Sequence, residues 1–186
     1  IHMKEKVLFF DIDGTLVDNT YGVYEVPEGV KRELKRIQNN GHKLFICSGR
    51  PKAMINQQFL DLGFDGYVLY NGGYIEIDGE SIFEERMDTE LATQTVDMLE
   101  ELNCDYMIET EHHIYIDKRY KEIYTFFKNL GMEEMFSMDF DRDDVLKRAI
   151  KIEANVTNKD KQKVSDYLDG KFGTTISYDQ HGSDNS

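Results

Sequence analysis

Two aspartates, Asp11 and Asp13, follow the apolar run 7–10 and stand two residues apart. If that run is a strand, side chains two residues apart point the same way, so both carboxylates face one place. One carboxylate can attack a phosphorus atom and form an aspartyl-phosphate, while the other exchanges protons with the leaving oxygen and with water. Because two close anions need a cation to coexist, and Mg²⁺ prefers hard oxygen ligands, the pair favours a magnesium site. The alternative is a pair of ordinary turn acids at a strand end.

The residues that follow support the chemical interpretation. Gly14 permits a tight turn, and Thr15 offers a hydroxyl group and backbone donors. The complete segment Asp-x-Asp-Gly-Thr after an apolar strand is far more specific than a bare pair of acids. It favours phosphate chemistry at residues 11–15 over a plain turn.

A second polar cluster, Ser48-Gly49-Arg50, follows the apolar run 43–47. A hydroxyl group at a strand end can donate a hydrogen bond to a phosphoryl oxygen as charge develops there. The alternative is that Ser48 caps a helix that begins near Pro51. Arg50 either shapes the same site or pairs with an acid on the surface.

A third polar cluster, Asn71-Gly72-Gly73, follows the apolar run 67–70. Taken alone, an asparagine followed by two glycines is also typical of an ordinary turn. Its place after a third apolar run favours a role beside the other two clusters.

The elements between these clusters predict how they meet. Two helices, one from Pro27 to about residue 40 and one from Pro51 to about residue 62, separate the three apolar runs. Alternating strands and helices predict an α/β fold with a doubly wound parallel sheet. Residues 7–10 and 44–47 are apolar at successive positions, which predicts that the strands 7–10 and 43–47 are buried on both faces. Ligands bind such sheets beyond the carboxyl ends of the strands, where all three clusters lie.

The pattern changes after about residue 80. We expect helices over residues 89–102, 120–130 and 159–168, and strands over residues 106–108, 114–116, 149–156 and 174–178. His112 and His113 fall at the tip of a hairpin and are interpreted as surface residues. These elements predict a second, α+β domain with a mostly antiparallel sheet, so that residues 1–79 and 80–186 form separate domains.

Composition narrows the class of protein. A net charge of −14 over 186 residues argues against nucleic acid as a partner, because phosphate backbones need a basic face. No apolar run approaches the ~20 residues that a membrane helix needs. No secretory signal is visible, and Cys47 and Cys104 are expected to be buried, reduced thiols, so we expect a cytoplasmic protein. The oligomeric state is left open.

The three clusters together resemble known motifs. The segment FFDIDGTLVD (residues 9–18) resembles the first motif of the haloacid dehalogenase superfamily, and ICSGRP (residues 46–51) its second. YNGGYI (residues 70–75), followed by an inserted domain, is similar to the Cof-like branch with a type IIB cap. The resemblance implies a Rossmann-like core with an inserted α+β cap, and a phosphatase acting on small phosphorylated metabolites such as sugar phosphates, nucleotides or cofactor phosphates.

The resemblance also implies roles for individual residues. Asp11 would be the nucleophile and Asp13 the general acid/base, with the Asp11 carboxylate and the Asp13 main-chain carbonyl binding Mg²⁺. Residues that would bind substrate or phosphate are Thr15, Ser48, Gly49, Arg50 and Asn71.

Two further motifs of the family have no match after Tyr178: a lysine in a Ser-Lys-Gly context, and an acidic Gly-Asp-x-x-Asn-Asp segment. Lys159, Lys161 and Lys163 lie in an expected helix and are poor substitutes for the missing lysine. The expectation is therefore a chain that stops before the core is complete. The alternatives are a catalytically incomplete fragment or interaction module of the same fold and, less favoured, a phosphomutase with the same aspartyl chemistry.

Overall fold

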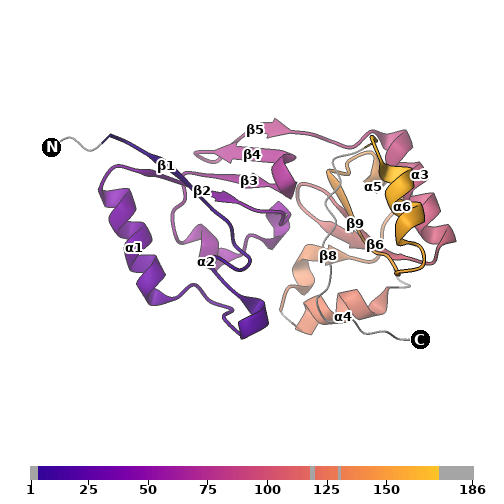
Figure 1. Cartoon of the computed structure of the whole chain (residues 1–186), viewed down its shortest axis with the longest axis horizontal. Helices are drawn as coiled ribbons and strands as arrows, with labels where there is room; N and C mark the ends of the chain where they lie inside the picture. Colours follow the sequence, from indigo (N-terminus) through magenta and orange to yellow (C-terminus); the bar gives the residue numbers. More distant parts are fainter. Residues whose placement is uncertain (1–3, 118–119, 130, 172–186) are drawn as a thin grey trace.

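The computed structural model describes residues 4–117, 120–129 and 131–171. Figure 1 shows two units side by side, each built on its own sheet. The first sheet has the strand order β1-β2-β3-β4-β5, with β1 (Val7–Phe10), β2 (Lys43–Cys47) and β3 (Gly66–Leu69) parallel. The antiparallel strands β4 (Tyr74–Ile77) and β5 (Glu80–Glu84) continue it. The predicted α/β fold is confirmed, whereas the hairpin of β4 and β5 was not foreseen.

Helix α1 (Glu28–Asn39) packs on one face of this sheet (Figure 1). Leu34 is buried and packs in one cluster with Leu8 and Phe10 of β1. The helix starts after Pro27, and Gly41 in the left-handed region (φ 79°) ends the turn that follows it. The helix predicted from the apolar spacing is confirmed.

Strand β1 is not buried on both faces, so that prediction is wrong. Val7 is 54% exposed and Phe9 is 60% exposed, while Leu8 and Phe10 on the other face are half-buried. The reason is that α1 covers only the face of Leu8 and Phe10. On the open face the Phe9 ring contacts Phe45 of β2, with 5.4 Å between the ring centroids.

The helix predicted from Pro51 to about residue 62 is broken in two. A 3₁₀ helix, η2 (Lys52–Met54), is followed by the four-residue helix α2 (Gln57–Leu60), with Asn56 extended between them. Met54 packs into the core of the second unit, but Ile55 packs into the core of the first. Adjacent residues of a continuous helix lie only ~100° apart around its axis, so the break lets the two side chains reach different cores.

The second unit has a sheet with the strand order β8-β7-β6-β9, mostly antiparallel as predicted. Its strands are β6 (Asp105–Glu109), β7 (Ile114–Ile116), β8 (Phe136–Ser137) and β9 (Lys151–Asn155). Its helices are α3 (Thr89–Glu101), α4 (Lys121–Asn129), α5 (Arg142–Leu146) and α6 (Lys161–Leu168). The short elements β8 and α5 were not predicted, and the strand expected over residues 174–178 lies outside the described residues.

Strand β6 is central to the second core. Tyr106, Met107 and Ile108 are consecutive and all buried, so both faces of this strand are covered. Val96 and Leu99 of α3 pack in the same cluster. The second unit therefore has a hydrophobic core of its own.

The segment between the two sheets crosses at residues 85–88. The Glu85 amide donates to the Gly73 carbonyl of the first unit, and the Met87 amide donates to the Ala149 carbonyl of the second, each at 2.8 Å. Since β5 belongs to the first sheet, that sheet runs past the expected boundary between residues 79 and 80 to Glu84.

The two cysteines differ in exposure. Cys104 is buried and Cys47, at the end of β2, is exposed, so the expectation of two buried thiols is wrong for Cys47. Both are free thiols. The alternation of β2 explains the difference, because Leu44 and Ile46 take the covered face and leave Cys47 on the open one.

Candidate active site

The turn after β1 presents both aspartates to solvent. Ile12 is fully buried, while Asp11 and Asp13 on either side of it are exposed. The amide of Gly14, which adopts a φ of 80°, donates to the Val17 carbonyl at 2.7 Å. The buried side chain of Ile12 and the tight turn at Gly14 fix the main chain on which the two exposed carboxylates stand.

Arg50 holds the carboxylate of Asp13 with two nitrogens. Its Nε lies 2.8 Å from Asp13 Oδ2, and an Nη atom lies 2.7 Å from Oδ1. The guanidinium also stacks over the Phe59 ring at 5.5 Å and donates to the Met54 carbonyl at 3.4 Å. Arg50 thus pairs with an exposed acid, Asp13, which is itself one of the predicted site residues, and joins the loop after β2 to the turn after β1.

Ser48 is buried at the end of β2 and does not cap a helix. Its Oγ accepts a hydrogen bond from the Arg50 amide at 3.2 Å. Pro51 is the residue that precedes η2, and no side chain caps that helix. Because the Ser48 oxygen accepts from Arg50, its own hydrogen is available for a ligand.

Asn71 completes the group from the end of β3. Its backbone is left-handed (φ 57°), a conformation that asparagine tolerates. Its main-chain N–H donates to the Ser48 carbonyl at 3.4 Å. A Cβ atom at Gly49 would lie 2.6 Å from Asn71 Oδ1. Any larger residue at position 49 would therefore displace the Asn71 side chain.

The three polar clusters converge on one edge of the sheet. Direct contacts join Asp13 to Arg50 and Ser48 to Asn71. Asp11 and Thr15 are tied to this group through the turn that they share with Asp13, where the Thr15 amide donates to the Ile12 carbonyl at 3.2 Å. The structure thus brings the predicted residues together but does not test their roles.

A lysine of the second unit also reaches this group, which the sequence did not suggest. Lys151 Nζ lies 3.2 Å from the Gly49 carbonyl oxygen, 3.3 Å from Glu109 and 3.0 Å from Glu153. Burial raises the pKa of Glu109 to about 8, although Lys151 opposes the shift. The alternation of β9 was the available signal, since it places Lys151 and Glu153 on one face, but nothing local pointed to Gly49.

Comparison with known proteins identifies the family. A family model described as haloacid dehalogenase-like hydrolase matches residues 8–185. The chain belongs to this family. YkrA of Bacillus subtilis (strain 168), which is named as a phosphatase, is 32% identical over 82 residues, which are 44% of this chain and 31% of that protein.

Solved structures of the haloacid dehalogenase superfamily share the fold. A subclass IIB sugar phosphatase, BT4131, has a TM-score of 0.72 at 23% identity, over 89% of this chain and 64% of that one. A haloacid dehalogenase-like hydrolase from Bacteroides thetaiotaomicron has a TM-score of 0.72 at 20% identity, over 94% of this chain and 68% of that one. The chain therefore spans 31% of the curated relative and about two thirds of the solved structures that it matches.

The oxygen atoms of this haloacid dehalogenase-like site fit a magnesium ion. Mg²⁺ is usually held by one or two carboxylates, with water and phosphate oxygens filling the remaining positions. The exposed Asp11 carboxylate and the Asp13 main-chain carbonyl are donors of that kind, while Arg50 holds the Asp13 carboxylate. No cluster of three or more His, Cys, Asp and Glu side chains that could hold a metal occurs in residues 4–117, 120–129 and 131–171.

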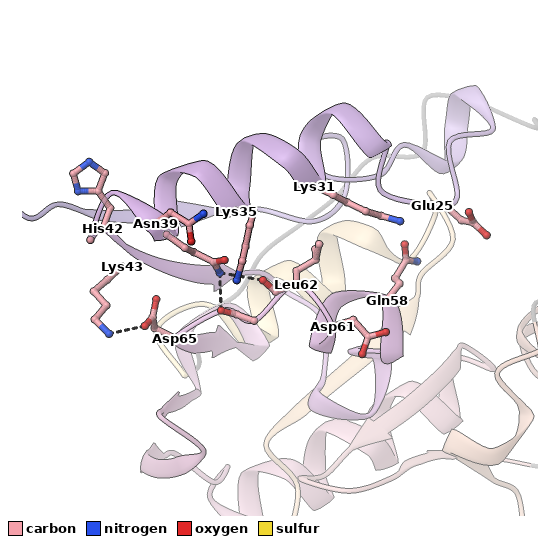
Figure 2. Close-up of a pocket in the computed structure, with 13 residues that line it drawn as sticks. Glu25, Lys31, Lys35, Asn39, His42, Lys43, Gln58, Asp61, Leu62 and Asp65 are labelled. Carbon is pink, nitrogen blue, oxygen red and sulfur yellow. Dashed lines mark hydrogen bonds and ion pairs between the residues drawn. The ribbon is translucent and has the colours of Figure 1, made fainter.

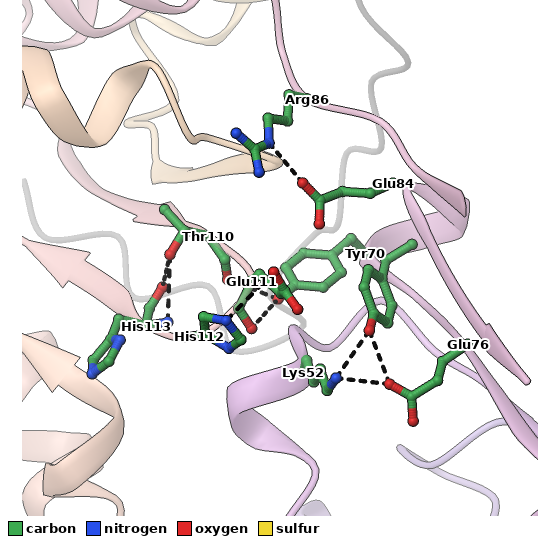
Figure 3. A network of polar contacts seen from close by, with 10 residues as sticks. Lys52, Tyr70, Glu76, Glu84, Arg86, Thr110, Glu111, His112 and His113 are labelled. Carbon is green, nitrogen blue, oxygen red and sulfur yellow. Dashed lines mark hydrogen bonds and ion pairs between the residues drawn. The ribbon is translucent and has the colours of Figure 1, made fainter. Parts of the chain in front are cut away.

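A second polar contact between the two units lies near the hairpin of β6 and β7 (Figure 3). Tyr70 is buried, and its hydroxyl donates to the Thr110 carbonyl at 2.8 Å. At the hairpin tip the His112 side chain is 70% exposed and lies 3.4 Å from Glu111. His113 is also exposed, so the prediction that both histidines are surface residues is confirmed.

A large open groove lies elsewhere on the first unit. Figure 2 shows it between α1 and the segment 58–65, with a volume of about 920 Å³. Lys31 and Lys35 of α1 line one side, and Lys43 pairs with Asp65 at 2.7 Å. None of the predicted site residues lines this groove, so size does not mark the site here. In the described part of the chain, no helix is both long enough and apolar enough to cross a membrane.

Proposed function

We propose that the protein is a Mg²⁺-dependent phosphatase that hydrolyses small phosphorylated metabolites through an aspartyl-phosphate at Asp11. The substrate class comprises sugar phosphates, nucleotides and cofactor phosphates. The observation that carries the proposal is the group of contacts among Asp13, Arg50, Ser48 and Asn71 at the carboxyl ends of parallel strands. Family membership supports it.

In the first step the Asp11 carboxylate attacks phosphorus, and the bond from phosphorus to the leaving oxygen breaks. Asp13 protonates that oxygen, so it must enter the step as a neutral acid. In the second step water attacks the phosphorus of the aspartyl-phosphate and Asp13 takes a proton from that water. The bond from phosphorus to the Asp11 oxygen breaks, which releases inorganic phosphate and restores the Asp11 carboxylate. When bound, Mg²⁺ would offset the negative charge shared by Asp11 and the phosphoryl group.

The contact with Arg50 constrains this cycle. While Arg50 holds both oxygens of Asp13, neither oxygen is free to exchange a proton with a leaving group or with water. For Asp13 to act as an acid, its carboxyl group must leave Arg50. The substrate phosphoryl group can take its place on Arg50, so substrate binding and the release of Asp13 from Arg50 would be coupled.

The charges at the site and the charge of the whole chain both affect how an anionic substrate binds. A net charge of −14 disfavours an anionic substrate at long range. At the site, Arg50 and Lys151 converge from the two units, and Mg²⁺ would add to them. Because Asp13, Glu109 and Glu153 pair with these two cations, a bound Mg²⁺ would have to supply the positive charge that attracts phosphate.

We further propose that the second unit is a cap that sets substrate specificity over the first. The expected division at residues 79 and 80 stays a proposal, and the pairing of β5 would move it to after Glu84. Two free thiols are consistent with a reducing compartment, and we propose a cytoplasmic location.

The test is hydrolysis of a generic aryl phosphate in the presence of Mg²⁺. We expect Asp11→Asn to lower kcat by about a thousandfold or more, because the nucleophile is lost. The matched control is Asp61→Asn, which changes an exposed aspartate after α2 and should leave turnover unchanged. Wild-type turnover in Asp11→Asn would show that the assignment is wrong.

A further inference from the structure

The peptide group between Gly49 and Arg50 is held at both ends. Its carbonyl oxygen accepts a hydrogen bond from Lys151 Nζ at 3.2 Å. Its N–H, on Arg50, donates to Ser48 Oγ at 3.2 Å. One rigid peptide plane thus joins a lysine of β9 in the second unit to the buried hydroxyl group of the first.

Lys151 is itself fixed by two acids. Glu109 lies opposite it in the register of β6 and β9, is fully buried, and lies 3.3 Å from Nζ. Glu153 lies two residues along β9, at 3.0 Å. Burial lowers the pKa of Lys151, but the charges of Glu109 and Glu153 outweigh it and the net shift is upward. The ammonium group that faces Gly49 is therefore charged at neutral pH.

A cation on the carbonyl oxygen affects the other end of the same peptide. It draws electron density toward the oxygen, which makes the Arg50 N–H a stronger donor, since hydrogen bonds in a chain polarise one another. The Ser48 oxygen is then held as an acceptor. Its hydrogen must point away from Arg50, which leaves the Ser48 hydroxyl free to donate to a phosphoryl oxygen.

We propose that Lys151 is a positioning residue, which orients the Ser48 hydroxyl group through the Gly49–Arg50 peptide. Ser48 is then oriented to donate to a phosphoryl group only when the second unit contacts the first through Lys151. The effect on turnover rests on the proposed phosphatase function, because Ser48 must meet a phosphoryl group. The geometry of the loop does not depend on that function.

Removal of Lys151 also threatens stability. Glu109 Oε2 is buried and has no hydrogen-bond partner among the described residues, so loss of the ammonium group leaves a buried acid with less compensation. The double variant Glu109→Gln with Lys151→Met removes this penalty. It keeps the test valid if Lys151→Met alone does not fold.

The first experiment is a double-mutant cycle on aryl phosphate hydrolysis in the full chain. Ser48→Ala should lower kcat by about 100-fold, as for loss of one donor to a developing charge. Lys151→Met should lower kcat by about tenfold, with KM changed by less than about twofold. In the Ser48→Ala background, Lys151→Met should have almost no further effect, because its action passes through Ser48.

Two control variants separate charge from packing. Lys151→Arg keeps a cationic donor and should restore most of the turnover lost in Lys151→Met. Lys163→Met makes the same change on the exposed face of α6 and should leave kcat unchanged. An equal loss on Lys151→Met in the wild-type and Ser48→Ala backgrounds would overturn the proposal.

The second experiment is a resonance measurement and does not depend on catalytic activity. Lys151→Met should shift the Arg50 amide proton and nitrogen resonances, and Lys163→Met should not. If the wild-type protein does not hydrolyse phosphate esters, the proposed function fails while this measurement still decides the positioning role. Unchanged Arg50 resonances in Lys151→Met would refute that role.

Discussion

Arg50 and Asp13 form a two-point ion pair that joins the loop after β2 to the turn after β1, with N–O distances of 2.7 and 2.8 Å. The two partners differ in exposure, since the Arg50 side chain is 17% exposed and the Asp13 side chain is 52% exposed. The arginine is thus the fixed partner, held by the Phe59 ring and the Met54 carbonyl. Asp13 can move without disturbing the core, which suits a group that changes partners during a reaction.

Arg50→Lys should slow the reaction without unfolding the protein. Lysine carries the same charge but cannot hold two oxygens at once or stack flat on Phe59. We expect kcat/KM for aryl phosphate to fall by about tenfold, the equivalent of about 1.4 kcal/mol of lost stabilisation. Arg36→Lys, in an exposed pair with Glu33, is the control and should have no effect. Equal kcat/KM in both variants would argue against a role for the two-point contact.

Gly49→Ala should separate function from stability. The new Cβ would lie 2.6 Å from Asn71 Oδ1, the end of a side chain that can rotate away. The loss of stability should stay below about 1 kcal/mol, but Asn71 should leave the site and turnover should fall by about tenfold. Gly29→Ala in α1, where the nearest atom is 3.8 Å away, should stabilise the protein by up to about 1 kcal/mol and leave turnover unchanged. Thermal melts with kinetics on both variants test this.

Glu109 should make stability fall as pH rises. Burial raises its pKa from 4.5 to about 8, so the folded protein binds this proton more tightly than the unfolded chain does. The stability that Glu109 adds by binding this proton is fully present below pH 4.5 and is lost as pH rises through about 8.

Glu109→Gln mimics the neutral acid and should flatten this dependence. Above about pH 8, the unfolding free energies of the wild-type protein and Glu109→Gln should differ by on the order of a few kcal/mol. Glu101→Gln, at an exposed position of α3, should keep the slope of the wild-type protein. Urea unfolding across this pH range measures it, and a slope that survives in Glu109→Gln would assign the effect to another group.

Tyr70→Phe should loosen the contact between the two units. It removes the hydroxyl that donates to the Thr110 carbonyl at 2.8 Å in a buried place. We expect a loss of about 1–3 kcal/mol in unfolding free energy, the usual effect of leaving a buried group without its partner. Tyr67→Phe on the neighbouring strand β3 is the control and should cost less. Equal losses in the two variants would mean that the hydroxyl contact contributes little.

Magnesium should stabilise the folded protein through Asp11. At a concentration 100 times its Kd, a ligand that binds only the folded state adds about 2.7 kcal/mol. Thermal melts with Mg²⁺ and with excess chelator should therefore differ, and Asp11→Asn should abolish the difference. Asp61→Asn, the exposed control, should keep it. Retention of the full shift in Asp11→Asn would place the ion elsewhere.

Some features missed in the sequence had local signals. Asp78 and Gly79, with φ of 51° and 82°, form the tight turn between β4 and β5, and Asp-Gly between two apolar segments is a strong hairpin signal. Asp141 caps α5 by accepting from the Asp144 amide at 2.9 Å, a position that aspartate favours. These elements were predictable, because a turn or a cap depends on a few adjacent residues.

Other features had no local signal. The helix breaks after Met54 because Met54 packs into the core of the second unit and Ile55 into the core of the first. The spacing of apolar residues alone cannot show this. The exposure of Val7 and Phe9 likewise depends on which face of β1 a helix covers. In both cases the pattern showed that the residues are apolar, but not what packs against them.

The sequence by itself determined the groups at the site and the edge on which they meet. Asp11, Asp13, Ser48 and Asn71 each follow an apolar strand, and the carboxyl ends of parallel strands lie at one edge of a sheet. Only the tertiary structure decided which groups touch. Arg50 on Asp13 and Lys151 on Gly49 join residues far apart in the chain. Such contacts are set by how two separately packed cores rest on each other, and no short stretch of residues encodes that.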